Sequence, residues 1–265
     1  MILDGRRIAA ELYAALSRRR KKLGRILTLG IIVSGHDPVI ESFVRIKKRA
    51  ADRLNIEMVR VDLPDSASNE DAVGAVRELA ERTDAVIVQL PLLNSLDTET
   101  VLAAIPDEKD VDAINPRVGE NEHTVVAPVA LAVVEMLQRG GIDPRGKHTV
   151  VVGQGRLVGA PSAALLRTRG ADVHMFTRTH SSIESLKDAD IIICGAGNPG
   201  FIKPVHVKSG VAIIDAGTSE SAGRIMGDAD PACADKASVF TPVPGGVGPV
   251  AVAMIFKNLL DLVVK

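Results

Sequence analysis

A regular alternation of apolar runs and amphipathic segments constrains the fold of this chain more than any other sequence feature. The runs at 26–35, 58–64 and 85–92 are short and rich in aliphatic residues, as buried strands are. Before and between them, apolar residues recur at helical spacing over 5–23, 42–56 and 69–82, the last with Ser68 or Asn69 as its cap. Strands that alternate with helices form parallel sheets, so this part of the chain is predicted to be a parallel α/β unit.

A polar stretch at 115–124 (NPRVGENEHT) separates this unit from a second one of the same kind. A helix is predicted over 128–139, and strands are predicted at 148–152, 172–176, 189–197, 210–217 and 238–243, with further helices after the first of them and at 181–187. A strongly apolar helical segment at 250–264 ends the chain and is expected to return to the first unit. The sequence therefore predicts a two-domain α/β protein, with residues 1–118 and 249–265 in one domain and residues 119–248 in the other.

Composition agrees with this fold class and narrows the kind of partner. Only 2% of the 265 residues are aromatic, so Leu, Ile, Val and Ala must build the cores, as they do where helices pack on a parallel sheet. The formal net charge of -1 gives no sign of a nucleic-acid surface. We therefore expect a small soluble substrate and no nucleic-acid partner.

Two further features bear on the compartment. The N-terminal segment is charged throughout, unlike a signal peptide, and no run approaches the roughly 20 apolar residues of a membrane span. Cys194 and Cys233 have neither disulfide nor metal-site spacing, and Cys194 lies in an apolar run where a buried thiol is more common than a nucleophile. The sequence predicts a cytoplasmic protein with no membrane partner and no metal site.

A glycine-rich turn follows the predicted strand at 148–152. Gly153, Gly155 and Gly159 have the spacing GxGxxxG and precede a helical pattern. Glycine there lets the backbone turn tightly and approach a pyrophosphate, which then rests on the helix N-terminus. The turn indicates a dinucleotide site, although a glycine-rich turn in a cofactor-free α/β protein stays an alternative.

The end of the next strand bears on which dinucleotide binds. Sites that favour NAD place an acidic residue there, whereas this chain has Thr177, Arg178, Thr179 and His180. An arginine beside hydroxyl groups attracts a 2′-phosphate and offers it bidentate hydrogen bonds. Arg178 therefore favours NADP as the cofactor, with a solvent-facing loop arginine as the alternative.

Three polar residues of the first unit are candidates for a second site. Lys47 lies on a predicted helix, Gln89 interrupts the apolar strand VIVQLPL, and Asp112 lies in KDVDAINP. A glutamine in a buried strand costs free energy unless it has hydrogen-bond partners. A lysine held by such an amide and shielded from water can carry protons. A surface lysine and a helix-capping aspartate are the commoner explanations for such residues taken singly.

Five motifs resemble, in order and spacing, those of the bifunctional methylenetetrahydrofolate dehydrogenase/cyclohydrolase family. They are FVRIK at 43–47, VQLPLL at 88–93, KDVDA at 109–113, VVGQGRLVGAP at 151–161 and TPVPGGVGP at 241–249. The segments ILDG at 2–5 and DPVIESF at 37–43 also look like the beginning of the family's chains. The resemblance therefore covers essentially the whole sequence.

The resemblance implies two reactions, the oxidation of 5,10-methylenetetrahydrofolate with NADP and the hydrolysis of the methenyl product to 10-formyltetrahydrofolate. It also implies a folate-binding first domain, a Rossmann-type NADP-binding second domain and a homodimer. Lys47 matches the family's catalytic lysine, Gln89 the glutamine that positions it, and Asp112 the aspartate that grips the pterin. The other matched positions are Phe43, Pro244, Gly245 and Gly246 for the substrate, and Gly153, Gln154, Gly155, Val158, Gly159, Arg178 and Thr218 for the cofactor.

The chain departs from the family's pattern at several of these positions. Phe43 replaces a tyrosine, which keeps a ring for stacking and removes a phenolic hydrogen bond. Gln154 and Gly155 replace Arg-Ser, and Ala113 and Asn115 replace a glycine and a histidine. Two alternatives therefore stay open: a dehydrogenase without cyclohydrolase activity, on tetrahydrofolate or a related pterin such as tetrahydromethanopterin, and a non-catalytic protein that binds NADP or folate.

Overall fold

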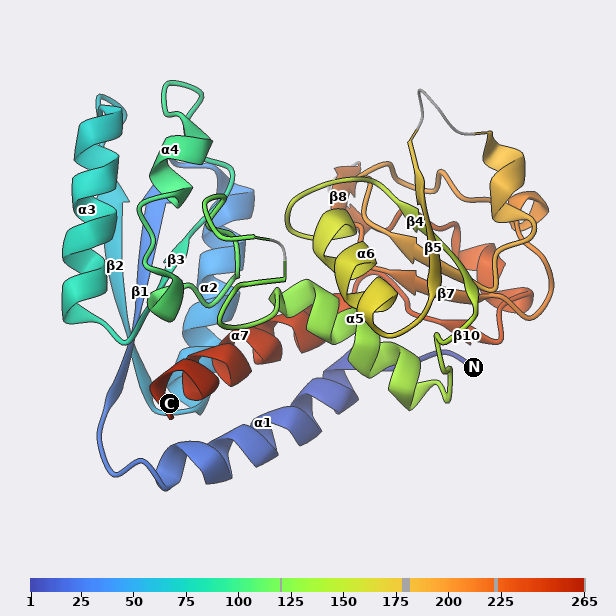
Figure 1. Cartoon of the computed structure of the whole chain (residues 1–265), viewed down its shortest axis with the longest axis horizontal. Helices are drawn as coiled ribbons and strands as arrows, with labels where there is room; N and C mark the ends of the chain where they lie inside the picture. The colour runs from blue at the N-terminus through green and yellow to red at the C-terminus, as the bar shows by residue number, and fades with distance from the viewer. Residues whose placement is uncertain (120, 178–181, 222–223, 265) are drawn as a thin grey trace. The chain divides into compact units, whose positions relative to one another are not determined.

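The computed structural model describes residues 1–119, 121–177, 182–221 and 224–264 (Figure 1). The chain forms two compact units: unit 1 comprises Met1–Ala10 and Val129–Ala251, and unit 2 comprises Glu11–Pro128 and Val252–Lys265. The chain crosses from one unit to the other within helix α1 (Gly5–Lys21) and again within helix α7 (Val247–Val263). The α/β fold class is confirmed, and so is the return of the last helix to the N-terminal α/β unit, which is unit 2.

Unit 2 is built on a parallel sheet. Within its described residues, β1 (Leu27–Ser34) lies between β2 (Ile56–Leu63) and β3 (Ala85–Val88). The helices of this unit besides the ends of α1 and α7 are α2 (Pro38–Arg53), α3 (Asn69–Arg82), the short α4 (Thr98–Leu102) and the 3-10 turn η1 (Asp107–Lys109). β3 is buried along its whole length, as strands of a parallel sheet are when both faces are covered.

Local sequence explains where the helices of unit 2 begin. Asp37 caps α2 by accepting the backbone N–H of Val39, and a proline occupies the first turn, so this helix starts four residues before the predicted 42. Ser68 caps α3 in a reciprocal pair with Asp71, which decides between the two predicted caps. The predicted strand at 85–92 ends at Val88 instead, close to the Leu90–Pro91 bond, where proline cannot donate to the ladder.

Unit 1 also contains a parallel sheet. Its described strands lie in the order β10 (Val239–Phe240), β7 (Ala212–Asp215), β6 (Ile191–Cys194), β4 (His148–Val152) and β5 (Asp172–Phe176). Ile2 bridges to Phe240 and extends the β10 edge. The other elements are α5 (Pro128–Arg139), α6 (Gly159–Thr168), the 3-10 turns η2 (Ile183–Leu186), η3 (Pro204–His206) and η4 (Pro231–Asp235), and the hairpin of β8 (Ser219–Ser221) and β9 (Arg224–Met226).

The differences from the predicted elements in unit 1 concern strand ends and short segments. Strands β6, β7 and β10 are shorter than the predicted 189–197, 210–217 and 238–243, and the turns η3 and η4 were not predicted. The helix predicted at 181–187 is a 3-10 turn over its described residues, and the β8–β9 hairpin was not predicted. Three-residue strands carry too few residues for a periodic pattern. None of the helices formed by the described residues has the length and apolar character that a membrane span requires.

Candidate active site

Lys47 and Gln89 meet at the end of β3 in unit 2. Gln89 directly follows the strand, and its backbone N–H donates to the carbonyl of Ile32 at 2.9 Å, which continues the sheet ladder by one residue. Its side chain is buried, with Oε1 accepting from Lys47 Nζ at 2.7 Å and Nε2 donating to the carbonyl of Leu90 at 2.7 Å. A buried amide needs such partners, so the amide oxygen fixes the position of the lysine nitrogen.

Burial and charge shift the proton affinities at this position. Loss of solvent lowers the pKa of Lys47, while the carboxylate of Asp112 acts in the opposite sense. Burial raises the pKa of Asp112 to about 6, with the Lys47 ammonium lowering it and Asp110 raising it further. A lysine whose pKa is depressed can exist as a neutral amine, and a neutral amine accepts a proton from water.

A buried aspartate holds the loop that carries Asp112. Asp110 is 1% exposed and accepts the backbone N–H groups of Asp112, Ile114 and Asn115, at 3.2, 2.7 and 2.8 Å. Asn115, which stands where the resembled family has a histidine, is buried in the same network and donates to the carbonyl of Ile105 at 2.7 Å. Asp110 was not among the predicted site residues, although it lies in the same KDVDA motif.

Two further residues adjoin these side chains along the chain. Phe43 lies one helical turn before Lys47 on α2 and is half-buried, so the ring and the amine share a face of the helix. Ala113, directly after Asp112, has a φ of 51°, in the left-handed region that favours glycine. The replacement of the family's glycine at this position is therefore accommodated with backbone strain.

The glycine turn of unit 1 is closely packed. Gly153 has a φ of 102°, and a Cβ on it would lie 2.6 Å from the Gly195 carbonyl oxygen. A Cβ on Gly159 would lie 2.0 Å from the Gly153 carbonyl oxygen, whereas a Cβ on Gly155 would meet nothing within 4 Å. Helix α6 starts here with Val158 as its N-cap and no side-chain cap. The turn thus presents an open glycine and an uncapped helix N-terminus, the arrangement that holds a dinucleotide phosphate.

Two buried aspartates shape the loops at the same edge of this sheet. Asp228 accepts the N–H groups of Ala196 and Asn198, both at 2.6 Å, in the loop after β6. Asp215, at the end of β7, accepts from Gly217 at 2.9 Å and from Ala229 at 2.8 Å. Burial raises the pKa of both carboxyl groups, that of Asp215 to about 7. Neither was predicted. For Asp215, the available signal was an acid at the end of the apolar strand AIID.

The structure describes all of the predicted cofactor residues except Arg178. The glycine turn with Gln154 and Val158 follows β4, and exposed Thr218 follows β7, so both lie at the carboxyl edge of one parallel sheet. Arg178, the residue from which NADP preference was predicted, lies outside the described residues. Arg156, which was not predicted, is an exposed cation inside the glycine turn.

The segment TPVPGGVGP belongs to unit 1. Gly245 has a φ of 106°, and its carbonyl accepts the backbone N–H of Gly5 at 2.9 Å. A Cβ on Gly5 would lie 1.7 Å from the Gly246 carbonyl oxygen, and the Gly246 N–H donates to Pro242 at 2.7 Å. Part of the glycine requirement in this motif is thus explained by packing against the N-terminal segment ILDG.

Known proteins of one family are similar to this chain over nearly its whole length. Residues 3–112 match the model of the tetrahydrofolate dehydrogenase/cyclohydrolase catalytic domain, and residues 127–265 match that of the family's NAD(P)-binding domain. A bifunctional protein FolD from Lacticaseibacillus paracasei is 36% identical over 98% of this chain and 96% of its own.

Solved structures of similar proteins have the same fold. The bifunctional FolD methylenetetrahydrofolate dehydrogenase/cyclohydrolase of Campylobacter jejuni is 29% identical with a TM-score of 0.93, covering 99% of this chain and 98% of its own. The Trypanosoma brucei methylenetetrahydrofolate dehydrogenase-cyclohydrolase, solved with NADP and an inhibitor, is 32% identical with a TM-score of 0.89, covering 99% and 96%. The resemblance inferred from the sequence motifs is confirmed.

Proposed function

Because the chain belongs to the tetrahydrofolate dehydrogenase/cyclohydrolase family, we propose that it oxidises 5,10-methylenetetrahydrofolate with NADP and hydrolyses the methenyl product to 10-formyltetrahydrofolate. The observation that carries this proposal is the partly buried Lys47, hydrogen-bonded to Gln89 and electrostatically coupled to Asp112. A protein that only binds folate or NADP has no need of a lysine held in this way. Residues 1–118 with 249–265 form the folate-binding domain in this proposal, and residues 119–248 form the NADP-binding domain.

The residues have distinct roles in the two steps. Bound NADP supplies a hydride acceptor for the methylene carbon, and the folate is left with a cationic methenyl bridge. Asp112 binds N–H groups of the pterin and orients it, and the ring of Phe43 stacks on it. Pro244, Gly245 and Gly246 contact the substrate through backbone atoms, as the resemblance implies.

Hydrolysis depends on the amine of Lys47. Water adds to the methenyl carbon, a C–O bond forms, and the neutral amine takes the proton that the water loses. The bond from that carbon to N5 then breaks, and N5 takes back the proton held by Lys47. The hydroxyl proton leaves to solvent as the C=O of the N10-formyl group forms. Gln89 keeps Lys47 Nζ in place throughout, because its oxygen accepts one of the N–H groups of the amine.

The glycine turn fits a bound dinucleotide. Gly153 and Gly159 are required by close packing, while Gly155 faces open space and leaves room for phosphate oxygens. Gln154, Val158 and Thr218 line the cofactor in this proposal, and the missing arginine at position 154 is compensated by Arg178 on the 2′-phosphate and by Arg156 in the turn.

Hydrolysis of methenyltetrahydrofolate by the purified protein tests the lysine. Lys47→Met should lower the rate by about 100-fold or more, which is what a general base contributes. Lys48→Met is the matched control, because the neighbouring Lys48 is exposed and pairs with Asp52. Equal rates in the two variants would rule out the role of Lys47, and a wild-type rate no faster than buffer would leave a dehydrogenase alone, as the missing hydroxyl at Phe43 suggests.

The nucleotide preference requires a separate comparison. Arg178→Ala should reduce kcat/KM for NADP far more than for NAD, since only NADP carries the 2′-phosphate. Arg156→Ala should weaken both nucleotides alike, because its proposed partner is a phosphate that they share. An unchanged ratio in Arg178→Ala would remove that residue as the determinant.

Assembly and location follow the family resemblance. We propose a homodimer that works in the cytoplasm. Light scattering of the purified protein at micromolar concentration should give twice the 28.0 kDa mass of the chain. A mass of one chain at that concentration would contradict the dimer.

A further inference from the structure

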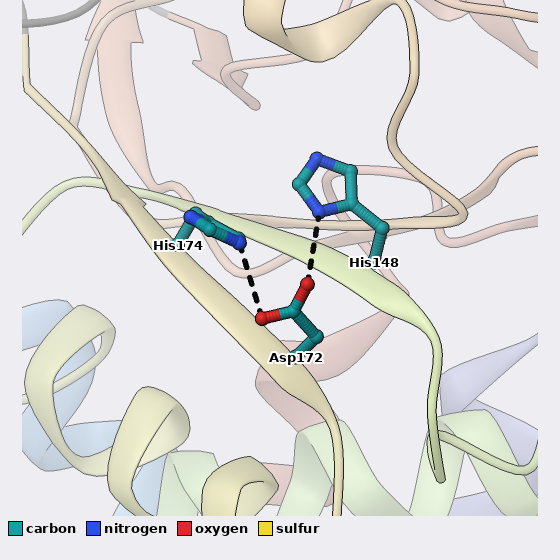
Figure 2. Close-up of side chains that lie close together, drawn as sticks. All are labelled: His148, Asp172 and His174. Atoms are coloured by element: carbon teal, nitrogen blue, oxygen red, sulfur yellow. Dashed lines mark ion pairs between the residues drawn. The ribbon is translucent and has the colours of Figure 1, made fainter.

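Three polar side chains gather at the amino end of β4 and β5 in unit 1, away from the glycine turn. They are His148, the first residue of β4, and Asp172 and His174 of β5 (Figure 2). One ligand atom from each lies within 4.8 Å of the other two. We infer that His148, Asp172 and His174 form a binding site for a divalent transition-metal ion of the zinc class.

The register of the two strands creates this cluster. His148 pairs with Asp172 across the parallel ladder, and His174 lies two residues along β5, so all three side chains project from one face of the sheet. On that face the next residues along the strands are apolar and buried, as Val150, Val152 and Phe176 are. The cluster is thus the polar end of a face that is otherwise core.

The ligand atoms of the three side chains lie close to one another. Figure 2 shows Asp172 between the two imidazoles, with one carboxylate oxygen 3.7 Å from His148 Nδ1 and the other 3.1 Å from His174 Nε2. The ring centroids of the two histidines are 4.8 Å apart. Ligand atoms around a tetrahedral zinc ion, with bonds of about 2.0–2.1 Å, are about 3.3 Å apart. Metal binding therefore requires side-chain rotations that bring the ligand atoms closer by up to about 1.5 Å.

The site is accessible on one side and anchored on the other. The side chains of Asp172 and His174 are 65% and 58% exposed, so an ion can reach them from solvent. His148 is held at its backbone, because its N–H donates to Asp190 at 3.0 Å and its carbonyl accepts the Asp190 N–H at 2.8 Å. The carboxylate of Asp190 is paired with Lys208 Nζ at 2.7 Å. Asp172 is therefore the one carboxylate that this site offers to the ion.

The ligand types select the class of ion. Two imidazoles and one carboxylate favour Zn²⁺, Co²⁺, Ni²⁺ or Cu²⁺ over Mg²⁺ and Ca²⁺, which prefer oxygen ligands alone. Three protein ligands leave a coordination position for water. His148 lies five residues before Gly153, or about 16 Å along the strand direction, so the ion would join β5 to β4 without touching the cofactor turn.

The test is direct ion binding to the full-length protein, stripped of metal with a chelator. Calorimetric titration with Zn²⁺ should give one site per chain, and Co²⁺ should give visible absorption bands that Zn²⁺ abolishes. His174→Asn and His148→Asn should each weaken Zn²⁺ binding by more than about 100-fold, since even outer-shell partners of metal sites cost about 10- to 100-fold. His36→Asn is the matched control, an exposed histidine of unit 2 outside the cluster. Zn²⁺ at 100 times its Kd should raise the Tm of the wild type by about 5–10 °C.

Two results would overturn the inference. One is the absence of stoichiometric Zn²⁺ binding to the wild type, which would leave Asp172 as an ion-pair acceptor for two histidines. The other is an equal loss of binding in His36→Asn and His174→Asn. Neither result bears on the folate reactions, because NADP affinity and methylenetetrahydrofolate oxidation should be the same in the metal-free variants and the metal-free wild type.

Discussion

The left-handed backbone at Ala113 leads to a prediction about stability. Its φ of 51° costs an alanine about 1–2 kcal/mol relative to a right-handed conformation, and glycine avoids that cost. Glycine also gains conformational freedom in the unfolded chain, which offsets about 0.5–1 kcal/mol. The side chain of Ala113 is a single half-buried methyl group, so little packing is lost. Ala113→Gly should therefore stabilise the protein by about 0.5–1 kcal/mol.

Thermal and urea unfolding measure this effect. The expected gain corresponds to a rise in Tm of about 1–4 °C for a chain of this size. Ala75→Gly is the matched control, because Ala75 lies within α3 in the right-handed conformation and the same change should cost about 1 kcal/mol. Asn55→Gly, at a φ of 52°, should gain less than Ala113→Gly, because asparagine tolerates this region better than alanine. A loss of stability in Ala113→Gly as large as that in Ala75→Gly would refute the strain argument.

Three further predictions concern the cofactor turn and the buried carboxyl groups. Gly159→Ala places a Cβ 2.0 Å from a turn carbonyl oxygen, so NADP affinity and Tm should both fall. Gly155→Ala should keep the wild-type Tm, because its Cβ meets nothing within 4 Å. Equal Tm values for the two variants would contradict this prediction. Since burial raises the pKa of Asp215 to about 7, the native state binds its proton more tightly than the unfolded chain, and stability should decline as pH rises from about 4 to about 7. In Asp215→Asn, the free energy of unfolding should depend less on pH over that range. A plot of this free energy against pH that runs parallel to that of the wild type would count against the prediction. Asp112→Asn removes the carboxylate that raises the pKa of Lys47, so the pH profile of kcat for methenyl hydrolysis should move to lower pH. A move to higher pH would exclude Lys47 as the titrating base.

The elements with complete local signals were predicted closely from the sequence. The helix over Asn69–Arg82 has a capping box at one end and apolar periodicity throughout, and its predicted bounds match the structure. The start of α2 was missed because its first turn, at Asp37 and Pro38, precedes the periodic pattern on which the prediction relied. Helix α4 has five residues, too few for periodicity to indicate a helix.

The candidate sites also contain some contacts that the sequence could predict and others that it could not. The contact of Lys47 with Gln89 was foreseeable, because a glutamine in a buried strand must find a partner. Asp228 accepts N–H groups 30 and 32 residues away, and Asp215 accepts one 14 residues away, so these partners become apparent only in three dimensions. The cluster of His148, Asp172 and His174 depends on the register of β4 with β5, and no spacing within the sequence reveals that register.

Unit 2 contains a structural contact between residues that lie far apart along the chain. Asn258, on α7, is 1% exposed and donates to the carbonyls of Val111 and Val126, both at 2.8 Å. These bonds tie the loop that follows Asp110 to a residue that the ribosome adds more than a hundred positions later. Domains often fold during synthesis in the order in which they emerge. Here the loop beside Asp112 gains these two hydrogen bonds only after Asn258 has been synthesised, long after the strands of its own sheet.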